Sequence, residues 1–179
     1  MKLAKGMKIP EFTYQAPDGS EHALYDLIRS GQRTAIVFLR FYGCPFTQLD
    51  LRSYEEHYKE MTATSGQLLV VVQSGRELVR EKLKKHPVSF PVACDPEGAL
   101  YKLLDIFPAV SKEVMRGPHA DKKRAAATAA GIEHGVTDGI VEQLPAAFVV
   151  YRSGTVLQAS YASFIDESVT AEQLAEWLH

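Results

Sequence analysis

The sequence predicts an α/β domain of three layers, in which a central mixed sheet carries helices on both faces. Two unbroken apolar runs, 34–40 and 67–73, are each followed by apolar residues at helical spacing. A strand, a helix and a second strand in this order form a right-handed parallel crossover. Residues 145–178 then indicate a hairpin and a final helix, which add antiparallel strands to the same sheet.

Length and charge restrict the class of protein. A chain of 179 residues is one domain's length, and it can bury roughly 70% of its unfolded surface without disulfide bonds. We expect one domain over 1–179, with an N-terminal hairpin extension at about 10–24 and a helical and loop insertion at about 107–143. Lys and Arg total 20 against 22 Asp and Glu, so the charge balance favours neither nucleic acid nor an anionic membrane as partner.

We expect the protein to be located in the cytoplasm. No apolar run approaches the roughly 20 residues of a membrane span, and the opening MKLAKGMKIPEF lacks the apolar core of a secretory signal. The chain has two cysteines, too few for a disulfide scaffold. In a reducing compartment, a cysteine at the start of a helix is better explained by chemistry than by a structural disulfide.

The N-terminal segment predicts a hairpin and a short helix. Phe12 and Tyr14 alternate with polar residues as in a strand, and Pro-Asp-Gly-Ser at 17–20 favours a turn. An extended piece at 21–23 completes the hairpin. Apolar residues between 24 and 28 then follow at the spacing of a brief amphipathic helix.

Residues 34–40 form the predicted central strand, which ends in a sharp break at Tyr42 and Gly43. A helix begins at once, because Pro45 suits the first helical position, where its missing N–H costs no hydrogen bond. Cys44 is then the N-cap. The free amides of the first turn and the positive end of the helix dipole favour its thiolate, the nucleophilic form. The alternative is that Cys44 is a small buried apolar residue, a common fate of free cysteines.

The middle of the chain continues the alternation of strands and helices. Residues 67–73 predict a second buried strand, and Ser74 with Glu77 predicts a capping box for the next helix. A short strand is expected at 89–93. After a turn that begins with Cys94, Leu100, Leu103 and Leu104 indicate another helix.

Residues 107–143 do not follow this alternation, which is the reason to expect an insertion there. Asp121 is the expected cap of an alanine-rich helix that ends at Gly131 in a left-handed conformation. His119 and His134 flank this helix. Their spacing fits no metal template, so we expect surface histidines and no metal site.

The C-terminal part is strongly patterned. Residues 145–151 predict a strand, 152–155 a hairpin turn and 156–161 the return strand. Thr170 and Gln173 have the spacing of a capping box for the last helix.

Taken together, these segments resemble the thioredoxin-fold redoxins, and specifically the alkyl hydroperoxide reductase and thiol-specific antioxidant (peroxiredoxin-like) family. The likeness covers nearly the whole chain and is most specific in GCPFT at 43–47 and LPAAFVV at 144–150. It implies a thioredoxin-like fold and an oxidoreductase that needs no cofactor. It further implies that Cys44 is the reactive cysteine and that Leu144–Pro145 is a cis peptide bond placed against the site.

The chain departs from thioredoxins in the turn after the cysteine. Thioredoxins carry C-x-x-C, whereas Thr47 stands at the second cysteine position here. A disulfide within this helix turn is therefore impossible. Thr47 can instead donate a hydrogen bond to the Cys44 sulfur and stabilise its thiolate, so we assign both residues to the catalytic group.

The chain also departs from peroxiredoxins. In their P-x-x-x-T-x-x-C pattern, the proline and threonine positions are occupied by Val37 and Phe41. The family's peroxide-activating arginine would fall at Pro145. Arg40 is the candidate substitute. The resemblance therefore supports thiol chemistry more firmly than it supports peroxide as the substrate.

Arg40 and Tyr42 also have a structural interpretation, in which Tyr42 packs on the rim of the sheet and Arg40 pairs with Asp50 or Glu55. Under the functional interpretation they help to shape the site. The residues expected to shape it are Arg40, Tyr42, Gly43, Pro45 and Pro145.

Two classes of function stay open. In the first, Cys44 attacks a small hydroperoxide or a disulfide, and the oxidised sulfur is resolved by Cys94 or by an external thiol such as glutathione or a thioredoxin-type protein. In the second, the chain is a redox-inactive module that binds a partner in the groove at cis-Pro145. Cys94 is the weaker candidate, because nothing near it in the sequence favours its ionisation. A homodimer is a further open expectation.

Overall fold

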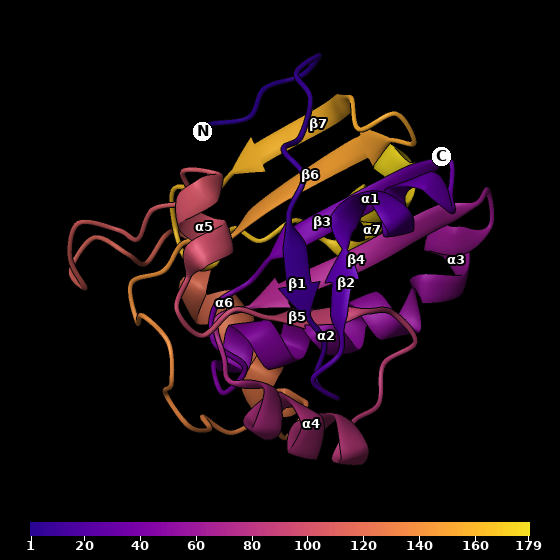
Figure 1. The fold of residues 1–179 in the computed structure, drawn as a ribbon. Coiled ribbons are helices and arrows are strands. Elements are labelled where there is room, and N and C mark those ends of the chain that lie inside the picture. Colours follow the sequence, from indigo (N-terminus) through magenta and orange to yellow (C-terminus); the bar gives the residue numbers. More distant parts are fainter.

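The computed structural model describes residues 1–179, and its centre is one mixed sheet of seven strands in the order β2-β1-β5-β4-β3-β6-β7 (Figure 1). The strands are β1 (Thr13–Gln15), β2 (Glu21–Ala23), β3 (Arg33–Phe38), β4 (Gly66–Val72), β5 (Val92–Cys94), β6 (Ala146–Tyr151) and β7 (Val156–Tyr161). The helices are α1 (Leu24–Arg29), α2 (Pro45–Glu56), α3 (Tyr58–Thr62), α4 (Arg76–Lys85), α5 (Ala99–Leu103), α6 (Ala120–Ala129) and α7 (Ala171–Leu178).

Strand β3 lies in the middle of the hydrogen-bonded ladder, between β4 and β6. It runs parallel to β4 and antiparallel to β6, so that Phe38 pairs with Val71 on one side and with Ala146 on the other. The apolar runs of the sequence are thus neighbouring central strands, as predicted. A strand that is covered on both faces buries every side chain, which is why its sequence does not alternate.

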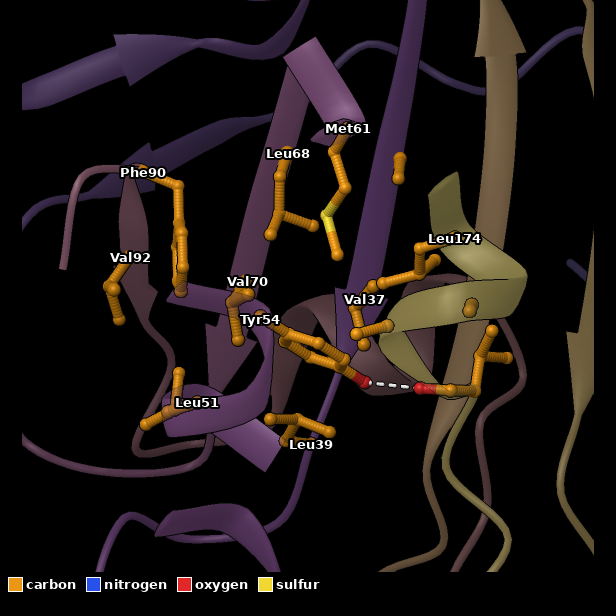
Figure 2. Close-up of a cluster of buried hydrophobic side chains, with 14 of the residues drawn as sticks. Val37, Leu39, Leu51, Tyr54, Met61, Leu68, Val70, Phe90, Val92 and Leu174 are labelled. Atoms are coloured by element: carbon orange, nitrogen blue, oxygen red, sulfur yellow. Dashed lines mark hydrogen bonds between the residues drawn. The ribbon is translucent and has the colours of Figure 1, made fainter. Parts of the chain in front are cut away.

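Two apolar clusters, one on each face of the sheet, confirm the three-layer α/β architecture. Helices α1 and α5 supply buried residues such as Ile28 and Tyr101 to one cluster. Helices α2, α3, α4 and α7 cover the opposite face, where Leu51, Met61 and Leu174 meet the side chains of β3 and β4 (Figure 2).

The helix that follows Cys44 is anchored in the second cluster by Tyr54. This side chain is 1% exposed, and its hydroxyl donates a hydrogen bond of 2.6 Å to the carbonyl oxygen of Val169 (Figure 2). A buried hydroxyl needs such a partner because an unsatisfied polar group inside a protein is costly. Leu51, Tyr54, Tyr58 and Met61 follow at helical spacing in the sequence, but the helix breaks at His57 and continues as the separate short helix α3.

Helix α6 lies in the 107–143 segment and packs on α2. The predicted N-cap of α6 is wrong: the N-cap is His119, and Asp121 lies inside the first turn. At the other end of the helix, Gly131 has the expected left-handed φ of 70°. The segment before α6 is held by Asp166, whose carboxylate accepts the backbone N–H of Gly117 and of His119.

The predicted capping box of α4 is absent, whereas that of α7 is formed. Gly75 is the N-cap of α4, and the Ser74 hydroxyl is engaged elsewhere, as described below. At α7, Thr170 and Gln173 exchange the two expected hydrogen bonds. No helix in the structure combines the length and the apolarity of a membrane-spanning segment.

Candidate active site

The site begins where β3 ends, and its local geometry is the predicted strand, turn and helix. Cys44 is the N-cap of α2 with an extended backbone, and Pro45 occupies the start of the helix. The Cys44 side chain is 1% exposed and forms no disulfide. Its sulfur does not cap the helix amides, so it remains available to another donor.

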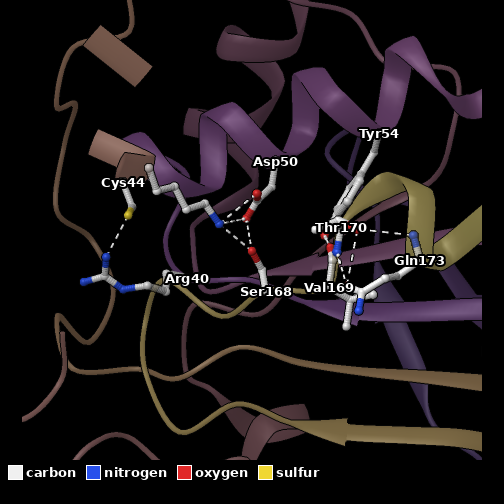
Figure 3. Close-up of polar contacts among 9 residues, drawn as sticks. Arg40, Cys44, Asp50, Tyr54, Ser168, Val169, Thr170 and Gln173 are labelled. Carbon is white, nitrogen blue, oxygen red and sulfur yellow. Dashed lines mark hydrogen bonds and ion pairs between the residues drawn. The ribbon is translucent and has the colours of Figure 1, made fainter. Parts of the chain in front are cut away.

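That donor is Arg40. Its Nη1 lies 2.7 Å from the Cys44 sulfur (Figure 3). Its Nη2 donates a hydrogen bond to the carbonyl oxygen of Val141. Arg40 is only 6% exposed, and its Nε has no hydrogen-bond partner. A guanidinium held this way places a permanent positive charge beside the sulfur, where it stabilises a negative one.

The structural interpretation of Arg40, in which it pairs with Asp50 or Glu55, is wrong. Both carboxylates have other partners, Asp50 with Lys123 and Glu55 with the N–H and hydroxyl of Ser89. The sequence suggested those pairings because Asp50 and Glu55 lie on the helix that begins directly after Cys44.

The predicted hydrogen bond from Thr47 to the Cys44 sulfur is also wrong. Thr47 is 1% exposed, and its hydroxyl oxygen has no hydrogen-bond partner. The sulfur meets the guanidinium of Arg40 instead. A charged donor forms a stronger bond to an anionic sulfur than a neutral hydroxyl does.

Gly43 lets the 107–143 segment lie directly against the cysteine turn. The N–H of Gly135 donates a 2.8 Å hydrogen bond to the Gly43 carbonyl, and Gln48 Nε2 bridges the carbonyls of Gly43 and Glu133. A Cβ atom at position 43 would lie 2.2 Å from the Val136 carbonyl oxygen. Only glycine therefore permits this close backbone approach.

Tyr42 joins the same turn to a second part of this segment. Its N–H donates to the Ser74 hydroxyl at 2.8 Å, and that hydroxyl donates to Asp138 at 2.6 Å. Asp138 also accepts the N–H of Gly75 at the start of α4, a role that no sequence pattern had indicated. The Tyr42 side chain is buried in the larger apolar cluster, the one that contains Leu51, Met61 and Leu174, and this burial raises the pKa of its phenol.

A cavity of about 430 Å³ opens beside Cys44 and Arg40. Phe41, Pro45 and Phe46 line it from the cysteine turn and α2. The lining residues that sequence reasoning missed come from 107–143 and the loop before α7: Met115, Arg116, Arg124, Ala127, Thr128, Ile132, His134, Val141 and Ile165. No local pattern identifies them, because their place over the cysteine depends on how this segment folds back.

A largely buried ion pair joins helix α6 to helix α2. Lys123 lies 2.9 Å from Asp50, and Ser168 donates a hydrogen bond to the same carboxylate (Figure 3). Both charged side chains are little exposed, at 12% and 14%. Burial raises the pKa of Asp50, and the Lys123 charge and the Ser168 hydroxyl oppose that rise. The pair holds one wall of the cavity against the cysteine helix.

The predicted cis bond before Pro145 is wrong, because the chain contains no cis peptide bond. The trans form of an X–Pro bond is favoured by about 0.5–1 kcal/mol unless the fold imposes the other. Here the chain enters β6 in an extended path, with Gln143 bonded to the Ile106 carbonyl and the Pro145 carbonyl accepting the N–H of Ala162. The thioredoxin-type groove that the cis bond would have formed is not part of the site.

Cys94 lies away from Cys44. It ends β5, pairs with Val72 of β4 and packs in the main apolar cluster, whereas Cys44 packs with Phe41 and Phe46 in a separate small cluster. Strand β4 stands between β5, which carries Cys94, and β3, which leads to Cys44, and the two thiols form no disulfide. Burial and the nearby Asp138 carboxylate raise the pKa of Cys94 to about 12.

Comparison with known proteins gives one family and many similar folds. The sequence profile of the AhpC/TSA family matches residues 6–159. Comparison with curated protein sequences gives no match.

Several crystal structures share the fold at low sequence identity. PrxQ of Xylella fastidiosa, solved as a mutant, superposes with a TM-score of 0.73 at 11% identity, covering 99% of this chain and 96% of its own. AhpC of Enterococcus faecalis gives 0.68 at 15% identity, covering 99% and 91%. Peroxidoxin BcpB of Mycobacterium tuberculosis gives 0.67 at 14% identity, covering 97% and 95%.

Proposed function

This chain belongs to the AhpC/TSA family of peroxiredoxin-like redoxins, and we propose that it is a thiol-dependent peroxidase in which Cys44 is the nucleophile. One observation carries the proposal: the Arg40 guanidinium lies 2.7 Å from the Cys44 sulfur, at a helix N-terminus beside an open cavity. The thiolate is the nucleophilic form of cysteine, and both the guanidinium and the positive end of the α2 dipole favour it. The family's peroxide-activating arginine would fall at Pro145 in this chain, and Arg40 supplies that positive charge instead.

In the proposed reaction, the Cys44 thiolate attacks the outer oxygen of a hydroperoxide. A sulfur–oxygen bond forms and the oxygen–oxygen bond breaks, so the sulfur is oxidised to sulfenic acid and the hydroperoxide is reduced to an alcohol. The departing alkoxide takes a proton from water. The Nη1 of Arg40, which lies beside the sulfur, is the donor nearest to the reacting atoms.

We propose that an external thiol resolves the sulfenic acid. That thiol forms a mixed disulfide with Cys44 and releases water, and a second thiol then frees Cys44 by exchange. Two observations support an external partner over Cys94: strand β4 lies between the strands that lead to the two cysteines, and Cys94 is held as a neutral thiol. The binding-module alternative loses its support, because it required a groove at cis-Pro145 and that bond is trans.

The test is a peroxidase assay with hydrogen peroxide and an alkyl hydroperoxide, run with and without glutathione or a thioredoxin. We expect Cys44→Ser to abolish turnover, since serine has no comparable anion near neutral pH, and Cys94→Ser to keep the wild-type rate. Mass spectrometry after peroxide alone is expected to show one added oxygen on Cys44 and none on Cys94. Wild-type turnover by Cys44→Ser would refute the proposal.

A further inference from the structure

The Arg40 guanidinium is held at Cys44 by a loop that comes from far along the chain. Its Nη1 contacts the Cys44 sulfur, and its Nη2 donates a hydrogen bond to the carbonyl of Val141. Val141 belongs to the 139–144 segment, which lies between α6 and β6 and outside both. Loop segments are generally more mobile than helices and strands. The position of the guanidinium therefore depends on what fixes this segment.

Gln73, directly after β4, fixes the segment at one end. Its side chain is 1% exposed, and its Oε1 accepts the N–H of Ile140, the residue before Val141, at 2.6 Å. The chain packs tightly there, since a Cβ atom at Gly139 would lie 2.6 Å from the Gln73 carbonyl oxygen. The backbone N–H of Gln73 also donates to the Arg40 carbonyl at 3.4 Å. One residue thus bonds to the main chain of Arg40 and anchors the loop that binds its guanidinium.

Gln143 is the second anchor of the segment and is buried as deeply as Gln73. Its Oε1 accepts a 3.2 Å hydrogen bond from Gln73 Nε2. Its own Nε2 donates to the carbonyls of Ile106 and Leu144. Neither amide is left without a hydrogen-bond partner. A buried polar network whose members are all bonded favours one arrangement of the groups that it joins.

Stability alone does not require two amides at these positions. When both partners of a buried hydrogen bond are replaced by apolar groups of the same shape, the free energy of unfolding can stay nearly unchanged. An apolar side chain at position 73, however, could not accept the N–H of Ile140, which is next to the carbonyl that holds the guanidinium. The amides therefore matter for where this segment lies.

We propose that Gln73 and Gln143 are positioning residues of the active site: they hold the segment whose carbonyl keeps the Arg40 guanidinium at the sulfur. The inference rests on the proposed function for the reaction and adds the residues that set the place of its positive charge. Neither glutamine lines the cavity beside Cys44. Both act on the sulfur through Arg40.

The kinetic test measures the second-order rate constant for oxidation of Cys44 by hydrogen peroxide. Gln73→Met nearly keeps the shape of the side chain and removes its hydrogen bonds, so we expect oxidation to slow about 3- to 10-fold. Gln143→Met removes the second anchor and is expected to slow it about 2- to 5-fold. It also gives an independent measurement if Gln73→Met does not fold. A wild-type rate in either variant, with the variant folded, would overturn the proposal.

The matched control is Gln67→Met, the same substitution near the opposite end of β4. The Gln67 side chain bonds to the hydroxyls of Ser30 and Thr34, away from the cysteine turn. This variant is expected to keep the wild-type oxidation rate, and urea unfolding compares its stability with that of Gln73→Met. Equal slowing in the two variants would show a general loss of stability and would refute a positioning role.

A double-mutant cycle shows whether Gln73 acts through the guanidinium. In Arg40→Gln there is no guanidinium to place, so adding Gln73→Met is expected to change the oxidation rate less than about twofold. If Gln73→Met slows Arg40→Gln as much as it slows the wild type, Gln73 supports the fold and not the position of the charge.

Alkylation separates this inference from the proposed function, because iodoacetamide reacts with Cys44 without any hydroperoxide. We expect alkylation to slow about 3- to 10-fold in Gln73→Met and to keep the wild-type rate in Gln67→Met. If no hydroperoxide oxidises Cys44 but alkylation follows this pattern, the peroxidase proposal fails and the positioning role stands. If Gln73→Met and the wild type are alkylated at the same rate, the positioning role fails and the peroxidase proposal is unaffected.

Discussion

The two cysteines of this chain are both buried, at 1% exposure for Cys44 and 7% for Cys94, yet their surroundings are opposite in charge. Cys44 heads a helix and meets the Arg40 guanidinium. Cys94 lies at the end of a strand among apolar side chains, and the charge that acts on it is the Asp138 carboxylate. Burial alone therefore does not decide whether a thiol reacts. The reactivity of a buried thiol depends on the sign of the charge beside it and on whether a cavity leads to it.

The largest expected difference between the two is their rate of alkylation. With a pKa of about 12, Cys94 is roughly one part in 10⁵ thiolate at pH 7. We expect iodoacetamide to modify Cys44 at least about a hundredfold faster than Cys94 in the folded protein, as measured by peptide mass spectrometry over time. The same comparison in denaturant is expected to give nearly equal rates. Equal rates in the folded protein would contradict the contrast between the two sites.

The second test removes the positive charge from Cys44. Loss of a charge-assisted hydrogen bond costs about 1.5–3 kcal/mol, so Arg40→Gln is expected to slow oxidation of Cys44 by hydrogen peroxide about 10- to 100-fold. Arg40→Lys keeps the charge and is expected to recover part of the rate. If Arg40→Gln and the wild type are oxidised at the same rate, the guanidinium does not act on the sulfur.

The smallest expected effect concerns stability at alkaline pH. The pKa of Cys94 is raised in the folded state above the value of about 8.5 for an unfolded cysteine. The folded state therefore keeps a proton that the unfolded state releases, and stability is lost as the pH rises from about 8.5 to about 12.

The variant Cys94→Ala lacks this proton. Relative to it, the wild type is expected to lose up to about 1.4 kcal/mol of unfolding free energy per pH unit within that range. Urea unfolding of both proteins between pH 8 and pH 10.5 measures the difference, and the buried tyrosines cancel because both proteins contain them. Curves that run parallel would show that Cys94 does not retain its proton on folding.

The sequence by itself determined the parts that depend on near neighbours in the chain. The apolar run at 34–40, the break at Gly43 and the proline at Pro45 were sufficient to place Cys44 at a helix start, because strand burial and helix initiation follow local rules. The same holds for the N-terminal hairpin, the central strands and the capping box at Thr170. These are the elements through which the chain resembles its family.

Only the tertiary structure decided which side chains meet the sulfur. Arg40 stands only four residues before Cys44, but its guanidinium is held by the carbonyl of Val141, which is 101 residues away in the chain. The Ser74–Asp138 bond likewise joins residues far apart in the chain. Such contacts form only when distant backbone segments pack together, so the wall of the cavity and its arginines emerged with the fold.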